Sequence, residues 1–70
     1  MSNNLSNYIK DMRHYCGLTQ VDLAAKSGVG LRFVRELEQG KQTLRIDKVN
    51  QVLALFGKEV GAVDAPREID

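Results

Sequence analysis

Residues 19–40 have the sequence TQVDLAAKSGVGLRFVRELEQG. Thr19 is a suitable N-cap, because its hydroxyl can accept a backbone N–H from the first turn of a helix. Gly28 is expected to end that helix. A second helix is predicted to begin near Gly30, with apolar residues every three positions, and to end at Gly40, since glycine readily adopts the left-handed conformation past a helix end. The stretch therefore predicts two short helices joined by a tight turn.

Two amphipathic segments flank this helix-turn-helix. Apolar residues repeat at helical spacing over residues 5–12, up to Gly17, and again over residues 46–56, up to Gly57. Because two short helices cannot bury a core alone, both flanking segments are expected to pack against them. The predicted core comprises Leu5, Ile9, Leu18, Leu23, Val34 and Leu37, covered by Ile46, Val49, Val52, Leu53 and Phe56.

The last thirteen residues, 58–70, differ in character from the rest. Residues Glu59, Val60, Gly61, Ala62 and Val63 are predicted to form a short strand, and the chain offers no second strand to pair with it. Pairing with the same segment of a second copy would cover the exposed strand edge. The expected fold is thus all-α, with a compact four- to five-helix domain over residues 1–57 and a dimerisation strand and tail over residues 58–70.

The charge of the chain is unevenly distributed. Residues 1–45 carry seven basic and four acidic side chains, whereas residues 46–70 carry three basic and five acidic ones. This mild asymmetry favours a polyanionic partner at the N-terminal two thirds. A length of 70 residues fits one domain with a small core, whose stability oligomerisation would increase.

Catalysis, disulfides and membrane insertion have little support in the sequence. Cys16 is the single cysteine, which fits a reducing cytosol, and His14 lies about 200° from it around a helix, so the two cannot act as a pair. No Gly-rich phosphate loop, metal-ligand spacing, basic leader or membrane-length apolar run is present. We therefore expect a cytoplasmic protein that is not an enzyme and uses no cofactor or metal.

Several short motifs occur at fixed spacing: Gly17-Leu18-Thr19-Gln20, Leu23-Ala24, Gly28-Val29 and Glu38-Gln39-Gly40-Lys41. With these motifs, residues 5–57 resemble the XRE type of helix-turn-helix, the family of phage Cro and lysogeny repressors. Residues 31–57 and the valine-bearing tail look most like HipB-type antitoxins, the partners of HipA-type kinase toxins. The resemblance implies a bacterial or phage-derived, nucleoid-associated repressor that binds a palindromic operator as a homodimer.

The family resemblance assigns Gln20 to a DNA phosphate, which its amide and the helix N-terminus would bind together. Helix N-termini present unpaired N–H groups and a positive dipole end, so they favour phosphate oxygens. The alternative for Gln20 is simple solvation in the first turn of the helix.

The segment 31–39 would be the recognition helix, which lies in the major groove of DNA. If Val34 and Leu37 face the core, the residues that lie on or flank the outer side are Leu31, Arg32, Arg35 and Glu36. Arg32 is the first choice for a base contact, because a guanidinium can bond guanine O6 and N7 together. Arg35 is assigned to phosphate, and Leu31 or Phe33 to a thymine methyl group. A solvated helix face is the alternative for both arginines.

Arg13 and Glu38 match positions that form a buried ion pair in the phage-repressor branch, so the resemblance gives them a structural role. Lys41 and Thr43, past the recognition helix, match positions that contact the phosphate backbone, which supplies affinity with little sequence choice. Gln39 and Gln42 are further candidates that do not match such positions as well. Gly30 replaces the Ser or Thr that the family usually has at this cap. The candidate DNA contacts are Thr19, Gln20, Gly30, Leu31, Arg32, Phe33, Arg35, Gln39, Lys41, Gln42 and Thr43.

Two other functions fit the same sequence. One is a stand-alone XRE-type repressor without a toxin. The other is a module that bridges proteins without contacting DNA, for which the acidic residues Glu36 and Glu38 on the recognition helix would be an argument.

Overall fold

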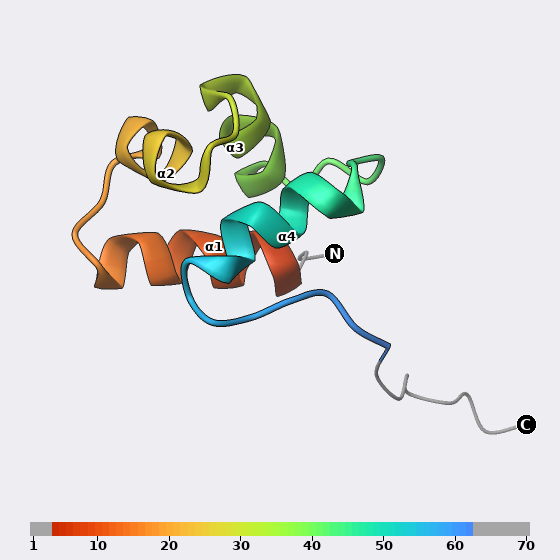
Figure 1. The fold of residues 1–70 in the computed structure, drawn as a ribbon. Coiled ribbons are helices and arrows are strands. Elements are labelled where there is room, and N and C mark those ends of the chain that lie inside the picture. Colours follow the sequence, from red (N-terminus) through yellow and green to blue (C-terminus); the bar gives the residue numbers. More distant parts are fainter. Residues whose placement is uncertain (1–3, 63–70) are drawn as a thin grey trace, which may run out of the picture.

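The computed structural model describes residues 4–62, and this part of the chain is all-helical, with no strand. In Figure 1, α1 runs along the base of the molecule, α2 and α3 lie above it, and α4 crosses in front. α2 packs against both α3 and α4, and α3 also packs against α1. None of these helices is long and apolar enough to cross a membrane. The four helices are α1 (Asn4–Tyr15), α2 (Gln20–Ser27), α3 (Leu31–Glu38) and α4 (Ile46–Ala54).

Both ends of α2 have the caps that the sequence predicts. The Asp22 N–H donates to Thr19 Oγ1, and the Thr19 N–H donates in return to Asp22 Oδ2, both at 3.0 Å. This second bond completes a capping box and lowers the pKa of Asp22 below its usual value. At the other end, Gly28 adopts the left-handed conformation, with a φ of 80°, and its N–H donates to the Ala24 carbonyl.

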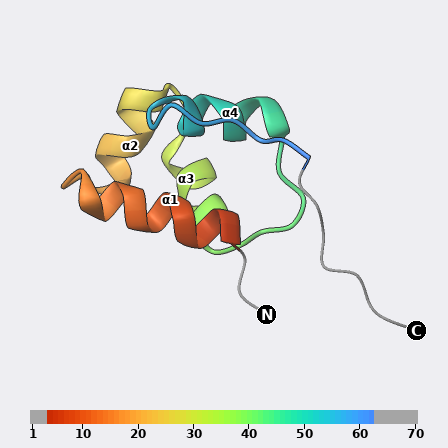
Figure 2. The same cartoon turned by 90° about the horizontal axis from the view of Figure 1, so that it is seen from below.

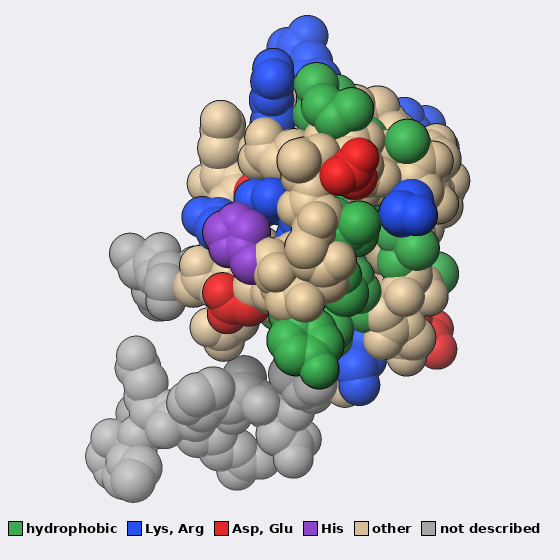
Figure 3. All heavy atoms as spheres, turned by 90° about the vertical axis from the view of Figure 1, so that its left-hand side faces the viewer, with side chains coloured by type: hydrophobic (Ala, Val, Ile, Leu, Met, Phe, Trp, Pro, Cys, Tyr) green, Lys and Arg blue, Asp and Glu red, His purple; other side chains and the backbone are tan. Residues whose placement is uncertain are grey.

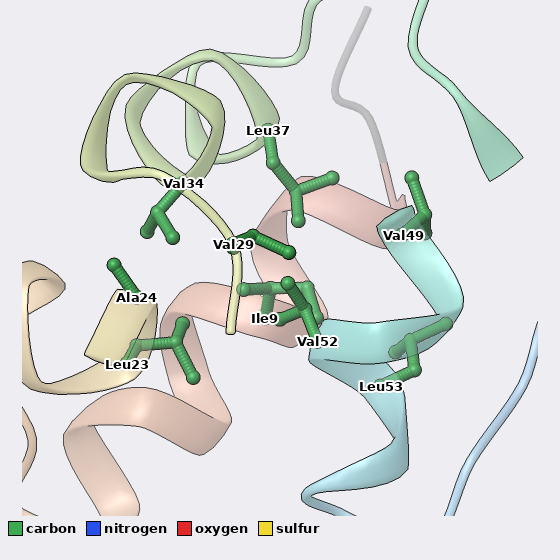
Figure 4. Close-up of a cluster of buried hydrophobic side chains, with 9 residues drawn as sticks. All are labelled: Ile9, Leu23, Ala24, Val29, Val34, Leu37, Val49, Val52 and Leu53. Carbon is green, nitrogen blue, oxygen red and sulfur yellow. The ribbon is translucent and has the colours of Figure 1, made fainter. Parts of the chain in front are cut away.

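The core lies between the helices, where nine buried apolar side chains meet (Figure 4). Ile9 of α1, Leu23 of α2, Val34 of α3 and Val52 of α4 are fully buried, so every helix contributes to a single cluster. Val29, from the turn between α2 and α3, also joins this cluster although the helical spacing did not predict it. The predicted Leu5 and Leu18 are only partly buried and pack against the edge of the cluster.

The prediction for Ile46 is wrong, because its side chain is 62% exposed. Ile46 is the first residue of α4, and the buried stripe of that helix begins one turn later, at Val49. Phe56, at the other end of the predicted stripe, is partly buried and forms an edge-to-face contact with Tyr8, with the ring centroids 6.5 Å apart.

The expected strand at Glu59–Val63 is not formed in its described part, residues 59–62, while Val63 and the tail 64–70 lie outside the described residues. Gly57 has a φ of 69° and lets the chain reverse, so that the segment runs back along α4 (Figure 2). There the Val60 N–H donates to Asn50 Oδ1 at 2.8 Å. The Val60 N–H, which a neighbouring strand could have bonded, is therefore bonded by the Asn50 side chain of α4.

Candidate nucleic-acid interface

The N-terminal ends of α2 and α3 border one open hollow of about 450 Å³, together with the C-terminal end of α1. The N-terminal ends of two helices bring N–H groups and positive dipole ends to one surface, which suits an anionic partner. Figure 3 shows Lys and Arg side chains projecting from the upper edge of the molecule, the edge on which α2 and α3 lie in Figure 1. The hollow is lined by Arg13, Gly17, Leu18, Thr19, Gln20, Val21, Leu31 and Arg35.

The two faces of α3 have opposite characters. Val34 and Leu37 are buried on the inner face, whereas Arg32 and Arg35 are exposed on the outer one, as the helical spacing predicts. The Arg32 side chain is 90% exposed. Gly30 precedes the helix and has no side chain to cap it, so no cap side chain accepts the first N–H groups of α3.

Leu31 and Phe33 are less accessible than the arginines. Both are partly buried and pack against the core, although Leu31 also lines the hollow. The ring of Phe33 faces Lys48 of α4, whose Nζ lies 6.0 Å from the ring centroid. Leu31 is therefore better placed than Phe33 for an apolar contact at the N-terminal end of α3.

The side chain of Gln20 has a partner within the fold. Its Nε2 donates a hydrogen bond of 3.2 Å to Glu38 Oε1, and the side chain is half-buried. An amide nitrogen carries two N–H groups, so this bond leaves one for another acceptor. Thr19 beside it is exposed, but its hydroxyl is engaged in the cap of α2.

Arg13 and Glu38 form an ion pair that joins α1 to the end of α3. Arg13 Nε donates to Glu38 Oε2 at 2.7 Å and Nη2 donates to Oε1 at 3.0 Å, while Nη1 donates to the Leu18 carbonyl at 2.9 Å. The Glu38 side chain is only 3% exposed. Burial alone would raise the pKa of Glu38, but hydrogen bonds from Arg13 and Gln20 outweigh it, helped by the charges of Arg13 and Lys10, and hold the pKa below its usual value.

The connector after α3 is exposed at all four predicted positions: Gln39, Lys41, Gln42 and Thr43. Lys41 Nζ donates to Glu36 Oε2 at 3.1 Å, and Arg32 Nε lies 3.7 Å from the same oxygen. Glu36 was not among the predicted site residues. The i,i+4 spacing of Arg32 and Glu36 was the signal in the sequence that could have identified it.

Comparisons with known proteins agree with this arrangement. The Helix-turn-helix family model matches residues 9–62. A protein of Sinorhizobium fredii (strain NBRC 101917 / NGR234), named as the uncharacterized HTH-type transcriptional regulator y4mF, is 43% identical over 60 residues, which cover 86% of this chain and 78% of that protein. The match includes α2, the turn and α3, and also the C-terminal part of α1 that borders the same hollow.

Proposed function

Because this chain belongs to the XRE-type helix-turn-helix family of DNA-binding regulators, we propose that it represses transcription by placing α3 in the major groove of an operator. The observation that carries this proposal is the outer face of α3. It presents the exposed Arg32 and Arg35 beside the N-terminal end of α2, while the opposite face of the same helix is buried.

Each exposed group has a separate role in this proposal. Arg32, whose side chain is 90% exposed, contacts base edges, preferring guanine. Arg35, next to the hollow, binds phosphate together with the free N–H of Gln20 and the N-terminus of α2. Lys41 and Thr43, past the C-terminal end of α3, bind the phosphate backbone, and these contacts make the affinity fall with rising salt.

Replacement of Arg32 by alanine tests the base contact. Loss of a guanidinium that bonds two acceptors of one guanine is expected to weaken operator binding roughly tenfold to a hundredfold. The measurement is a gel-shift titration with the DNA upstream of the gene, or with a duplex that the wild-type protein selects from a random library. Lys26→Ala is the matched control, since Lys26 is an exposed cation in the last turn of α2, outside both the predicted DNA contacts and the proposed dimer interface.

Equal operator binding by the wild type and Arg32→Ala would contradict the proposal. Gln20→Ala is a poorer test, because the Gln20 amide also bonds Glu38 and its removal changes the fold around that carboxylate.

We further propose that the protein acts as a homodimer on a palindromic operator. A single short recognition helix contacts few base pairs, whereas two copies place two such helices about one DNA turn apart, roughly 34 Å. The described part of the C-terminal segment, residues 58–62, is exposed. Residues 58–61 border an open apolar groove with Leu5, Tyr8 and Leu53, which suits contact with a second copy.

Truncation after Gly57 is expected to convert the dimer into a monomer, because it removes the segment assigned to the interface. Sedimentation measures the mass, and circular dichroism checks that the truncated chain is still helical. A truncated protein that stays helical and as dimeric as the full chain would place the interface elsewhere.

The resemblance of residues 31–57 to HipB-type antitoxins supports a second partner, a HipA-type kinase toxin. In this proposal the repressor binds the kinase with a surface other than α3 and represses the operon that encodes both proteins. Co-purification with a kinase encoded next to its gene would support this role. A neighbourhood without any such kinase gene would favour the stand-alone repressor.

A further inference from the structure

Glu36 of α3 lies between two cations that the proposed function assigns to DNA, Arg32 and Lys41. Its Oε2 accepts a hydrogen bond of 3.1 Å from Lys41 Nζ and lies 3.7 Å from Arg32 Nε. The other acidic residue of α3, Glu38, is buried in its pair with Arg13 and faces away from this surface. Glu36 is therefore the carboxylate that DNA phosphates would meet on this helix.

The three side chains differ in exposure. Arg32 and Lys41 are 90% and 47% exposed, whereas Glu36 is 26% exposed, so the carboxylate is held close to the helix while the cations extend from it. The arrangement leaves the Nη groups of Arg32 and part of Lys41 within reach of a ligand, and a ligand that approaches Arg32 Nε or replaces the bonded Lys41 Nζ–H competes with the carboxylate.

We propose that Glu36 increases the preference of the protein for its operator over other DNA. It does so by forming ion pairs with Arg32 and Lys41, with which the phosphates of DNA of arbitrary sequence compete poorly. This inference rests on the proposed function. Phosphates of non-operator DNA must compete with the carboxylate for both cations, and they also bring like charge towards it. An operator that has a guanine opposite Arg32 accepts two directed hydrogen bonds from it, and these offset the loss of the Glu36 ion pair. A phosphate of non-operator DNA does not provide these two bonds.

The size of the effect follows from the exposure of the pairs. An exposed ion pair changes an equilibrium constant by up to about fivefold, and two such pairs share this carboxylate. Removal of the charge is therefore expected to raise affinity for random-sequence DNA by about three- to tenfold. The affinity for the operator should change less, because the operator already compensates Arg32.

Glu36→Gln tests this inference, since it keeps the size of the side chain and removes its charge. Dissociation constants are measured for a random-sequence duplex and for the duplex that the wild-type protein selects from a random library. For Glu36→Gln we expect the ratio of operator affinity to random-sequence affinity to be lower than for the wild type. On random-sequence DNA, the logarithm of the binding constant should also fall more steeply with the logarithm of the salt concentration. The slope should change by about 0.9 for each cation that becomes free to bind a phosphate. Asp11→Asn, which removes one exposed carboxylate from α1, should change both affinities by the same small factor.

A second variant tests whether Glu36 acts through Arg32. In an Arg32→Ala background, Glu36→Gln should change the affinity ratio less than it does in the wild type. If Glu36→Gln raised the affinity for both duplexes by the same factor, as expected for Asp11→Asn, Glu36 would act only as a negative charge that repels DNA, and the inference would be wrong. A loss of operator affinity with unchanged binding to random DNA would also overturn it, and would make Glu36 a direct base contact. If the wild type binds neither upstream nor selected DNA, the proposed function itself fails.

Discussion

Arg13→Ala is expected to destabilise the domain by about 3–5 kcal/mol, because it leaves the Glu38 carboxylate buried without its cation. A domain of this size has a total stability of about 4–10 kcal/mol, so much of it would be lost. The variant also removes the hydrogen bond to the Leu18 carbonyl, at the chain segment that leads into α2. Urea unfolding followed by circular dichroism measures the change.

The control replaces both partners, as Arg13→Met with Glu38→Leu. Removal of a buried ion pair in favour of apolar side chains of similar volume is often neutral or stabilising. We therefore expect the double variant to be much more stable than Arg13→Ala alone. A double variant as unstable as the single one would show that the ion pair contributes more than the cost of an unpaired charge.

The same pair predicts how stability depends on pH. The pKa of Glu38 is lower in the folded protein than its usual value of 4.5, so the ionised carboxylate stabilises the fold above that pH. This contribution is lost as the pH falls from about 4.5 through the folded-state pKa. In thermal unfolding, the wild type should therefore lose stability below this pH more steeply than the double variant, which lacks the carboxylate.

Leu37→Ala is the second substitution with a large expected effect. Leu37 is 1% exposed and belongs to the cluster that all four helices share, so its truncation removes apolar contacts and leaves a cavity. Changes of this kind cost about 2–5 kcal/mol. The urea midpoint of unfolding is therefore expected to fall markedly, and DNA binding should fall only in proportion to the fraction that is unfolded.

Leu55→Ala is the matched control, because Leu55 is 41% exposed and follows the end of α4. Truncation there should change the urea midpoint far less than Leu37→Ala does. Similar losses at both positions would mean that the exposed leucine is covered in solution, for example by a second copy of the chain.

The sequence predicts the features that depend on neighbouring residues. Thr19 and Gly28 mark the ends of α2 because capping and left-handed geometry are local requirements. The spacing of Val34 and Leu37 correctly assigns the buried face of α3, and hence its outer face. Periodicity does not show where a core ends, which is why Ile46 was wrongly placed in it.

Features that depend on distant residues were harder to predict. Valines favour a strand at residues 59–63, but the described segment instead follows α4 because Asn50 binds the Val60 N–H ten positions away. The bond from Gln20 to Glu38 spans eighteen positions and could not be inferred from either residue alone. The Arg13–Glu38 pair was anticipated from family resemblance, since no local pattern connects residues so far apart.

Glu38 accepts hydrogen bonds from α1 through Arg13 and from α2 through Gln20, although it belongs to α3. One carboxylate thus restrains the rotamer of Gln20 before any ligand arrives. Immobilising a free side chain on binding costs about 0.5–1.5 kcal/mol of conformational entropy. The Gln20 amide at the N-terminus of α2 has already lost its rotamer freedom during folding. A phosphate that binds there therefore pays a smaller cost in side-chain entropy.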